Sequence, residues 1–256
     1  MKINGIQQLG VGVIDIEEAW NWYRNFFSMD ILMFDEEAVA ELMLAHTDGQ
    51  PRKRHAILAL NLEGGGGFEI WKHTGKSPTP IDFEIQLGDL GINIGVLKCQ
   101  DAEIAYQKYA TDGLNLLGEI SINPNGNKHF FLKDIYNNIW EIKEHSEVFK
   151  KEKAVNGGVF GSIIGVCSID ESLVVYRDIL GYDEVIYDQT GVFNAVGTLG
   201  MGAMQYQAIA PSGSGPGGGG TTTGGGFTTS SYTPTSTAPA STGTVSAPSY
   251  YGGFGG

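Results

Sequence analysis

An internal repeat constrains the fold of this chain more than any other sequence feature. Residues 12–35 and residues 165–188 match at eight of 24 positions without a gap, at a constant offset of 153. Each copy reads as an alternating strand, a few capping residues, a helix with a Tyr-Arg pair and a second strand. Self-similarity at a fixed spacing indicates a duplicated supersecondary unit. The offset is long for one such unit and fits two, so a middle unit should lie between the copies.

Charge divides the chain into two parts. All 45 charged residues lie at or before Asp188, and residues 189–256 carry none. The net charge of −13 therefore belongs to the front part, and it argues against a nucleic-acid partner or an anionic membrane surface. Residues 211–256 form a Gly, Ser, Thr, Pro and Tyr tract that we expect to be disordered, because it offers too little apolar surface to offset the entropy of ordering. A native tail, a fused linker and an erroneous chain end all fit this tract.

The chain shows no sign of export or membrane insertion. No apolar run of signal-peptide length follows Met1, and no stretch approaches about 18 consecutive apolar residues. Cys99 and Cys167 lie in strand-like runs without ligand or pairing spacing, so both are predicted to be reduced core residues. We therefore expect a cytoplasmic protein with no membrane partner.

Apolar periodicity divides the front of the chain into two units of βαβββ order and the start of a third. The first strand places Leu9 and Val11 on one face and Gln8 and Gly10 on the other, and this small, polar face suits a cavity wall. The third unit loses its pattern after Asp188, so we predict an incomplete copy. The predicted fold is α+β, with a two-unit domain at residues 1–146, the incomplete unit at 157–205 and the low-complexity tail at 211–256.

Three short pieces of sequence carry a family likeness. They are Gln8 seven residues before Asp15 and followed by Tyr23; the strand end Phe68-Glu69-Ile70-Trp71; and a closing hairpin in which Phe131-Leu132-Lys133-Asp134 leads through Asn138 to Trp140-Glu141-Ile142. They resemble the vicinal oxygen chelate superfamily, which includes glyoxalase I, bleomycin-resistance proteins and extradiol dioxygenases. The resemblance implies that two βαβββ units pair into an eight-stranded cup around a divalent metal.

The resemblance also implies a ligand set, because the family places one metal ligand on the first strand and one on the last strand of each unit. Carried over, these positions are Gln8 and Glu69 in the first unit and Glu141 at the end of the second. The fourth falls on Asn93, preferred to its neighbour Ile94 because the strand pleat should turn Asn93 toward the cup. A glyoxalase has histidine there, so this chain departs from the pattern.

This ligand set consists of oxygen atoms and carries two negative charges. Mg²⁺ or Mn²⁺ would accept it more readily than Zn²⁺, and Ni²⁺ also stays open. A bound metal would act as a Lewis acid on two vicinal oxygens of a small substrate, with Glu141 and Glu69 as candidates for proton transfer. The implied function is a metal-dependent lyase or isomerase acting on a small oxygenated or thiol-conjugated substrate.

A second interpretation needs no metal. Gln8 could hydrogen-bond within the cup and Glu69 could be solvated, in which case the protein would sequester a small molecule as bleomycin-resistance proteins do. His73 and His129 lie at strand ends and are predicted to be surface residues. Both functions stay open at this point. An incomplete third unit leaves an apolar helix face uncovered, so we expect it to pack on the first domain, to pair with another chain as a homodimer, or to be loosely folded.

Overall fold

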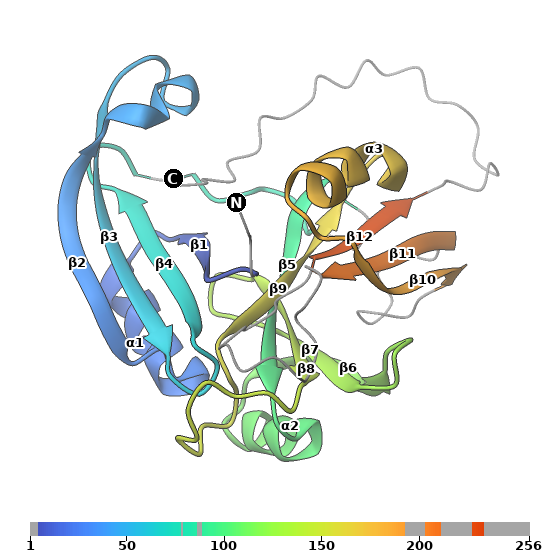
Figure 1. Cartoon of the computed structure of the whole chain (residues 1–256). Helices are drawn as coiled ribbons and strands as arrows, with labels where there is room; N and C mark the ends of the chain where they lie inside the picture. Colours follow the sequence, from blue (N-terminus) through green and yellow to red (C-terminus); the bar gives the residue numbers. More distant parts are fainter. Residues whose placement is uncertain (1–4, 78, 86–88, 193–202, 211–226, 233–256) are drawn as a thin grey trace.

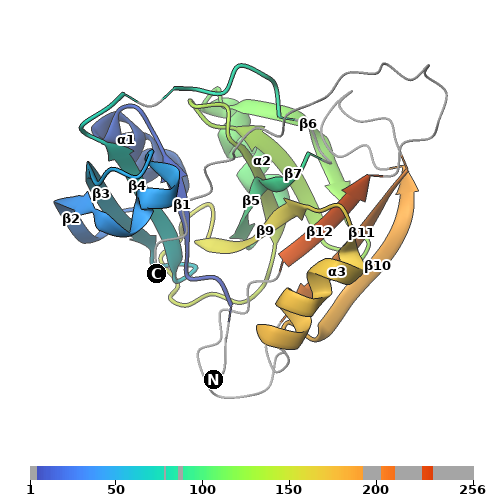
Figure 2. The same ribbon diagram turned by 90° about the horizontal axis from the view of Figure 1, so that it is seen from above.

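The structure is a computed structural model that describes residues 5–77, 79–85, 89–192, 203–210 and 227–232. Figure 1 shows two sheets side by side, and Figure 2 shows the same arrangement from above. Three successive units of βαβββ order build these sheets, and two of the units share one sheet. Within the described residues, no helix is long and apolar enough to cross a lipid bilayer.

The first unit forms a four-stranded sheet by itself. Its elements are β1 (Gln8–Gly12), α1 (Ile16–Phe27), β2 (Ile31–Ala40), a 3₁₀ helix (Glu41–His46), β3 (Arg52–Asn61) and β4 (Gly66–His73). The strand order is β1-β4-β3-β2, with β1 parallel to β4. The Asp15 carboxylate accepts a hydrogen bond from the backbone N–H of Glu18 at 3.0 Å and caps α1. Ile16, Tyr23 and Phe27 form the buried side of this helix.

The second unit repeats this order. Its elements are β5 (Gly91–Cys99), α2 (Ala102–Thr111), β6 (Asn115–Ile122), β7 (Lys128–Lys133) and β8 (Ile139–Glu144). Asp101 caps α2 by accepting a hydrogen bond from the backbone N–H of Ile104 at 2.9 Å. The strand order is β5-β8-β7-β6 with β5 parallel to β8, so the topology matches the first unit strand for strand.

The third unit has more strands than the sequence predicts. It contains β9 (Val159–Gly165), α3 (Ile169–Leu173) continued by a π-helical segment (Val174–Ile179), β10 (Glu184–Val192), β11 (Ala203–Ala210) and β12 (Phe227–Tyr232). The order β9-β12-β11-β10, with β9 parallel to β12, repeats that of the other units. The prediction of an incomplete copy is therefore corrected.

β12 lies inside the tract at 211–256 that composition assigns to a disordered tail. Its Thr and Ser residues pair through backbone hydrogen bonds whether or not they bury apolar surface, and β-branched Thr suits a strand. Amino-acid composition indicates only how much apolar surface a segment can bury, so it did not reveal a strand that is held by backbone hydrogen bonds. The rest of the predicted tail, residues 211–226 and 233–256, lies outside the described residues.

The eight-stranded sheet joins the second unit to the third. β5 pairs antiparallel with β9, for example at Ile94 and Ile163. β10 and β6 are the two ends of this sheet, yet Tyr187 on β10 and Leu117 on β6 both pack on the apolar cluster around Ile94 and Phe131. The sheet is therefore curved into a cup. The predicted eight-stranded cup is present, but the second and third units build it instead of the first and second.

The first and second units meet through an aromatic core. Tyr23, Phe27 and Trp140 belong to one buried cluster that spans both units. Within it, Asp134 accepts hydrogen bonds from the Tyr23 hydroxyl at 2.7 Å and from Trp140 Nε1 at 2.9 Å. Burial of these rings holds the first two units together through their packed faces and not through strand pairing. The edge of β5 is therefore available to pair with β9.

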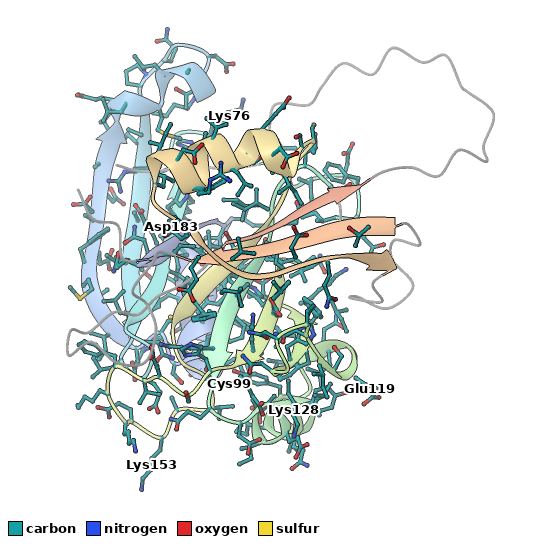
Figure 3. The ribbon with its side chains drawn as sticks, turned by 45° about the vertical axis from the view of Figure 1, so that its right-hand side comes forward. Lys76, Cys99, Glu119, Lys128, Lys153 and Asp183 are labelled. Carbon is teal, nitrogen blue, oxygen red and sulfur yellow. The ribbon has the colours of Figure 1, made fainter. Side chains whose placement is uncertain are left out.

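The two cysteines occupy different environments. Cys99 is buried on β5, where burial raises the pKa of its thiol to about 12 (Figure 3). Cys167 is exposed just before α3. The predicted core position is therefore confirmed for Cys99 and wrong for Cys167.

Candidate functional site

A cavity of about 1090 Å³ lies against the first sheet. One wall is formed by β1 and the end of β4, and the other by residues 79–85, the start of β5 and the turn between β7 and β8. Its rim carries the apolar side chains of Ile14, Ile81, Phe83 and Ile92, which are 55%, 56%, 42% and 42% exposed. Exposed apolar groups gathered at one opening favour a ligand with an apolar body.

Gln8 and Glu69 form the polar part of the first wall. Gln8 Nε2 donates a hydrogen bond to Glu69 Oε2 at 2.9 Å, across the parallel pair of β1 and β4. Because the amide donates in this direction, the remaining oxygens, Gln8 Oε1 and Glu69 Oε1, are both acceptors. This part of the wall therefore offers acceptors and a carboxylate charge.

Trp71 and His73 continue the cavity wall along β4. Their rings meet edge to face with centroids 5.0 Å apart. Burial lowers the pKa of His73 below its ordinary value, and the charge of Arg52 acts in the same direction. The His73 imidazole is therefore neutral at pH 7, and the wall presents aromatic surface beside the carboxylate.

Asn93 borders the same cavity but is not arranged as a ligand beside Gln8. Its side-chain amide donates a hydrogen bond to the backbone carbonyl of Asp89. The pairing of β5 with β9 shifts register between Ile92 and Ile94, and Ile94 is the residue that packs inside the cup. The pleat argument that favoured Asn93 fails because it assumed a regular strand.

Glu141 is buried in a different place, on β8 within the eight-stranded sheet. His129 Nδ1 lies 2.8 Å from Glu141 Oε1. Burial raises the pKa of Glu141, but hydrogen bonding to His129 and the charge of Lys143 outweigh this effect, so the pKa lies below its ordinary value. Glu141 is therefore an ionised carboxylate that already has a partner.

The four predicted ligands do not come together. Gln8 and Glu69 are in contact, Asn93 is bonded to a backbone carbonyl, and Glu141 contacts His129 and is not part of the cavity wall. Among the described residues, no group of three or more His, Cys, Asp or Glu side chains is placed to hold a metal ion. The residues present therefore do not fit the divalent metal site that the resemblance implies.

His129 is the partner of Glu141 that the sequence reasoning did not reveal, since it was predicted to be a surface residue and its side chain is only 13% exposed. Its hairpin contained the necessary signal, since the register of β7 and β8 pairs Phe131 with Glu141. His129 is two residues from Phe131, on the same face of the strand and diagonal to Glu141. Its other ring nitrogen, Nε2, lies 3.0 Å from the Ser121 hydroxyl on β6.

No protein-family model and no curated protein matches this chain. Among solved structures, glyoxalase I from Zea mays is similar with a TM-score of 0.53 and 10% sequence identity, over 89% of this chain and 67% of that protein. A putative dioxygenase from Bacillus subtilis subsp. subtilis str. 168 is similar with a TM-score of 0.55 and 12% identity, over 89% of this chain and 64% of that protein. At such identities the likeness concerns the fold. The repeated βαβββ units and these similarities together confirm that the chain has the fold of the vicinal oxygen chelate superfamily.

Proposed function

We propose that this protein binds a small molecule in the cavity of the first sheet without a metal ion. The observation that carries the proposal is the pair of Gln8 and Glu69 on the wall of a cavity with apolar side chains at its rim. Binding sites of this kind combine a mostly apolar enclosure with a few convergent polar groups.

The polar groups indicate which end of a ligand they would bind. Gln8 Oε1 and both oxygens of Glu69 are acceptors, so the ligand should donate hydrogen bonds from an amine or a hydroxyl. The faces of aromatic rings attract cations, and Trp71 lies on the same wall. We therefore expect an apolar body with an amine or hydroxyl head, and we expect anionic heads to be rejected by the Glu69 carboxylate.

The metal-dependent lyase or isomerase that the resemblance implies has less support. In a glyoxalase-type reaction the metal supplies Lewis-acid chemistry, and this chain brings only Gln8 and Glu69 of the expected ligands into contact. Glu141, the expected base, lies with His129 in the other sheet. Cytoplasmic location and a homodimer stay predictions.

A matched set of probes tests the proposal. Benzylamine, benzyl alcohol and benzoate share one ring and differ in the head group, and binding can be followed by ligand-observed NMR. We expect benzylamine to bind best and benzoate not to bind, and we expect Glu69→Ala to weaken benzylamine binding about tenfold, which corresponds to about 1.4 kcal/mol. Glu119→Ala removes an exposed carboxylate on β6 and should change nothing (Figure 3).

Two results would contradict the proposal. One is equal binding of all three probes, or equal binding by wild type and Glu69→Ala. The other is micromolar Mn²⁺ binding that both Glu69→Ala and Glu141→Ala abolish, because that result would require the two carboxylates to share one metal.

A further inference from the structure

A row of basic residues crosses the inner face of the eight-stranded sheet. The register pairs Lys98 on β5 with Lys143 on β8, and it pairs Lys143 with His129 on β7. Residues paired in this way lie on the same face of a sheet, with Cβ atoms about 4.5–5.5 Å apart in antiparallel pairs. Lys98 is only 2% exposed and Lys143 only 6% exposed. Two largely buried lysine side chains therefore lie side by side on this face.

Their surroundings leave this positive charge poorly compensated. In the described part of the chain, neither ammonium forms an ion pair, although the less deeply buried Lys128 and Lys133 each have a carboxylate partner. Lys143 Nζ lies instead 6.0 Å from the ring centroid of Phe160 and 5.9 Å from that of Tyr187.

Two carboxylates act on this row from a distance. Glu141 acts on Lys143 and is already in contact with His129, and Glu147 acts on Lys98. Burial lowers the pKa of the Lys98 ammonium despite Glu147. His145 is also close, since the charges of Lys98 and Lys143 add to the effect of burial in lowering its pKa. In the described residues, neither carboxylate forms an ion pair with a lysine of this row, and Glu141 is already bonded to His129.

Such an arrangement is costly without a further partner. Like charges directly opposite on neighbouring strands destabilise a sheet, and removing an ion from water is unfavourable unless a counter-charge lies in contact with it. The chain as a whole carries a net charge of −13, so this buried basic row has the opposite sign to the protein's net charge. A small anion between the lysines would contact both ammonium groups and accept their hydrogen bonds.

We propose that Lys98 and Lys143 bind a small oxyanion, either a phosphate or a carboxylate group, on the inner face of the cup formed by the second and third units. This site is separate from the cavity of the first sheet, whose walls do not include either lysine. It is therefore independent of the function proposed above.

Thermal unfolding of the full chain tests this site. Melting temperatures are measured with phosphate, sulfate or acetate, each against chloride at the same pH and ionic strength. We expect at least one oxyanion to raise the melting temperature by several degrees, and the comparison of phosphate and sulfate with acetate separates a tetrahedral from a carboxylate ligand. A titration by calorimetry should then give a dissociation constant that Lys143→Met or Lys98→Met weakens at least tenfold.

Lys128→Met is the matched control, because Lys128 starts β7 beside α2 and its ammonium is paired with Glu103 at 2.6 Å (Figure 3). It should retain the full response to the oxyanion. In chloride alone, Lys98→Met and Lys143→Met should melt at higher temperature than wild type, because each relieves the repulsion between the two neighbouring lysines.

Three outcomes would overturn the proposal. The first is that no oxyanion stabilises the wild-type protein more than chloride does, a result that needs no variant to fold. The second is that Lys128→Met loses the response as fully as Lys143→Met. The third is that both buried-lysine variants fold and keep wild-type affinity for the oxyanion.

Discussion

The carboxylates of Glu69 and Glu141 occupy the same position in the last strands of two repeated units, and their partners differ. In the first unit the matching position of the first strand is Gln8, and its amide lies 2.9 Å from Glu69. In the second unit that position is Ile94, which offers no polar atom, and Glu141 contacts His129 at 2.8 Å on the opposite side. The first unit, with Gln8 on its first strand, thus has a polar cavity wall. The second unit, with Ile94 at the same position, has a buried carboxylate that is paired with a histidine.

Two units with the same fold can therefore place the same residue type in different kinds of site. Glu69 lies on a cavity wall with acceptors facing a ligand, whereas Glu141 is buried and already compensated. Four sets of variants can break or sharpen this contrast.

The largest effect is expected at the core that fixes the two units against each other. Asp134→Ala should lower the free energy of unfolding by more than about 4 kcal/mol, because Tyr23 and Trp140 would each lose a charged hydrogen-bond partner inside the core. Urea unfolding measures this loss. Asp112→Ala, which removes an ion-pair partner of Lys108 at the end of α2, should cost less than about 1 kcal/mol. Similar losses in both variants would show that the units are not joined through Asp134.

The next largest effect is the difference in unfolding free energy between removing Glu141 and removing Glu69. Glu141→Ala leaves His129 and Lys143 without a buried counter-charge and should cost about 3 kcal/mol. Glu69→Ala removes a half-buried group from a cavity wall and should cost less than about 1 kcal/mol. Urea unfolding measures both losses. A larger loss of stability for Glu69→Ala than for Glu141→Ala would contradict the assignment of Glu141 as the buried, charge-paired carboxylate.

Exchanging Gln8 and Ile94, the matching residues on the first strands of the two units, should destabilise the protein by unequal amounts. Ile94→Gln places an amide in an apolar cluster where Ile94 is 1% exposed, and it should cost about 2–3 kcal/mol. Gln8→Ile should cost less than about 1 kcal/mol because Gln8 lines an open cavity. A near-neutral Ile94→Gln variant would mean that Glu141 can accept an amide partner as Glu69 does.

The smallest effect concerns pH. The folded-state pKa of Glu141 lies below its unfolded value of about 4.3, so its contribution to stability is complete above pH 4.3 and is lost as pH falls through the folded pKa. The difference in unfolding free energy between wild type and Glu141→Gln should therefore shrink below about pH 4. Melting curves between pH 3 and 7 measure it. A difference that grows as the pH falls would indicate a raised pKa.

Local signals in the sequence were sufficient for the elements of the first two units. Asp15 and Asp101 cap the helices that they precede, and the spacing of Tyr23 and Phe27 marks a buried helix face. These features depend on neighbours within a few residues, so a single sequence contains them. Gln8 and Glu69 were grouped only by the family resemblance, as two of four implied metal ligands, and their hydrogen bond to each other was not predicted.

Features that depend on distant partners could not be predicted in this way. Whether β5 pairs with β1 or with β9 is decided by aromatic packing between units, which no local pattern records. Asn93 was misplaced because a register shift beside Ile94 breaks the regular alternation. β12 was missed because its pairing uses backbone groups that composition does not report.

A double-mutant cycle tests most directly whether Glu69 and Glu141 belong to separate sites. The unfolding free energies of wild type, Glu69→Ala, Glu141→Ala and the double variant are measured in urea. Separate sites predict additive losses, with a coupling energy below about 0.5 kcal/mol. A coupling energy above about 1 kcal/mol would place both carboxylates in one interacting site and contradict the separation.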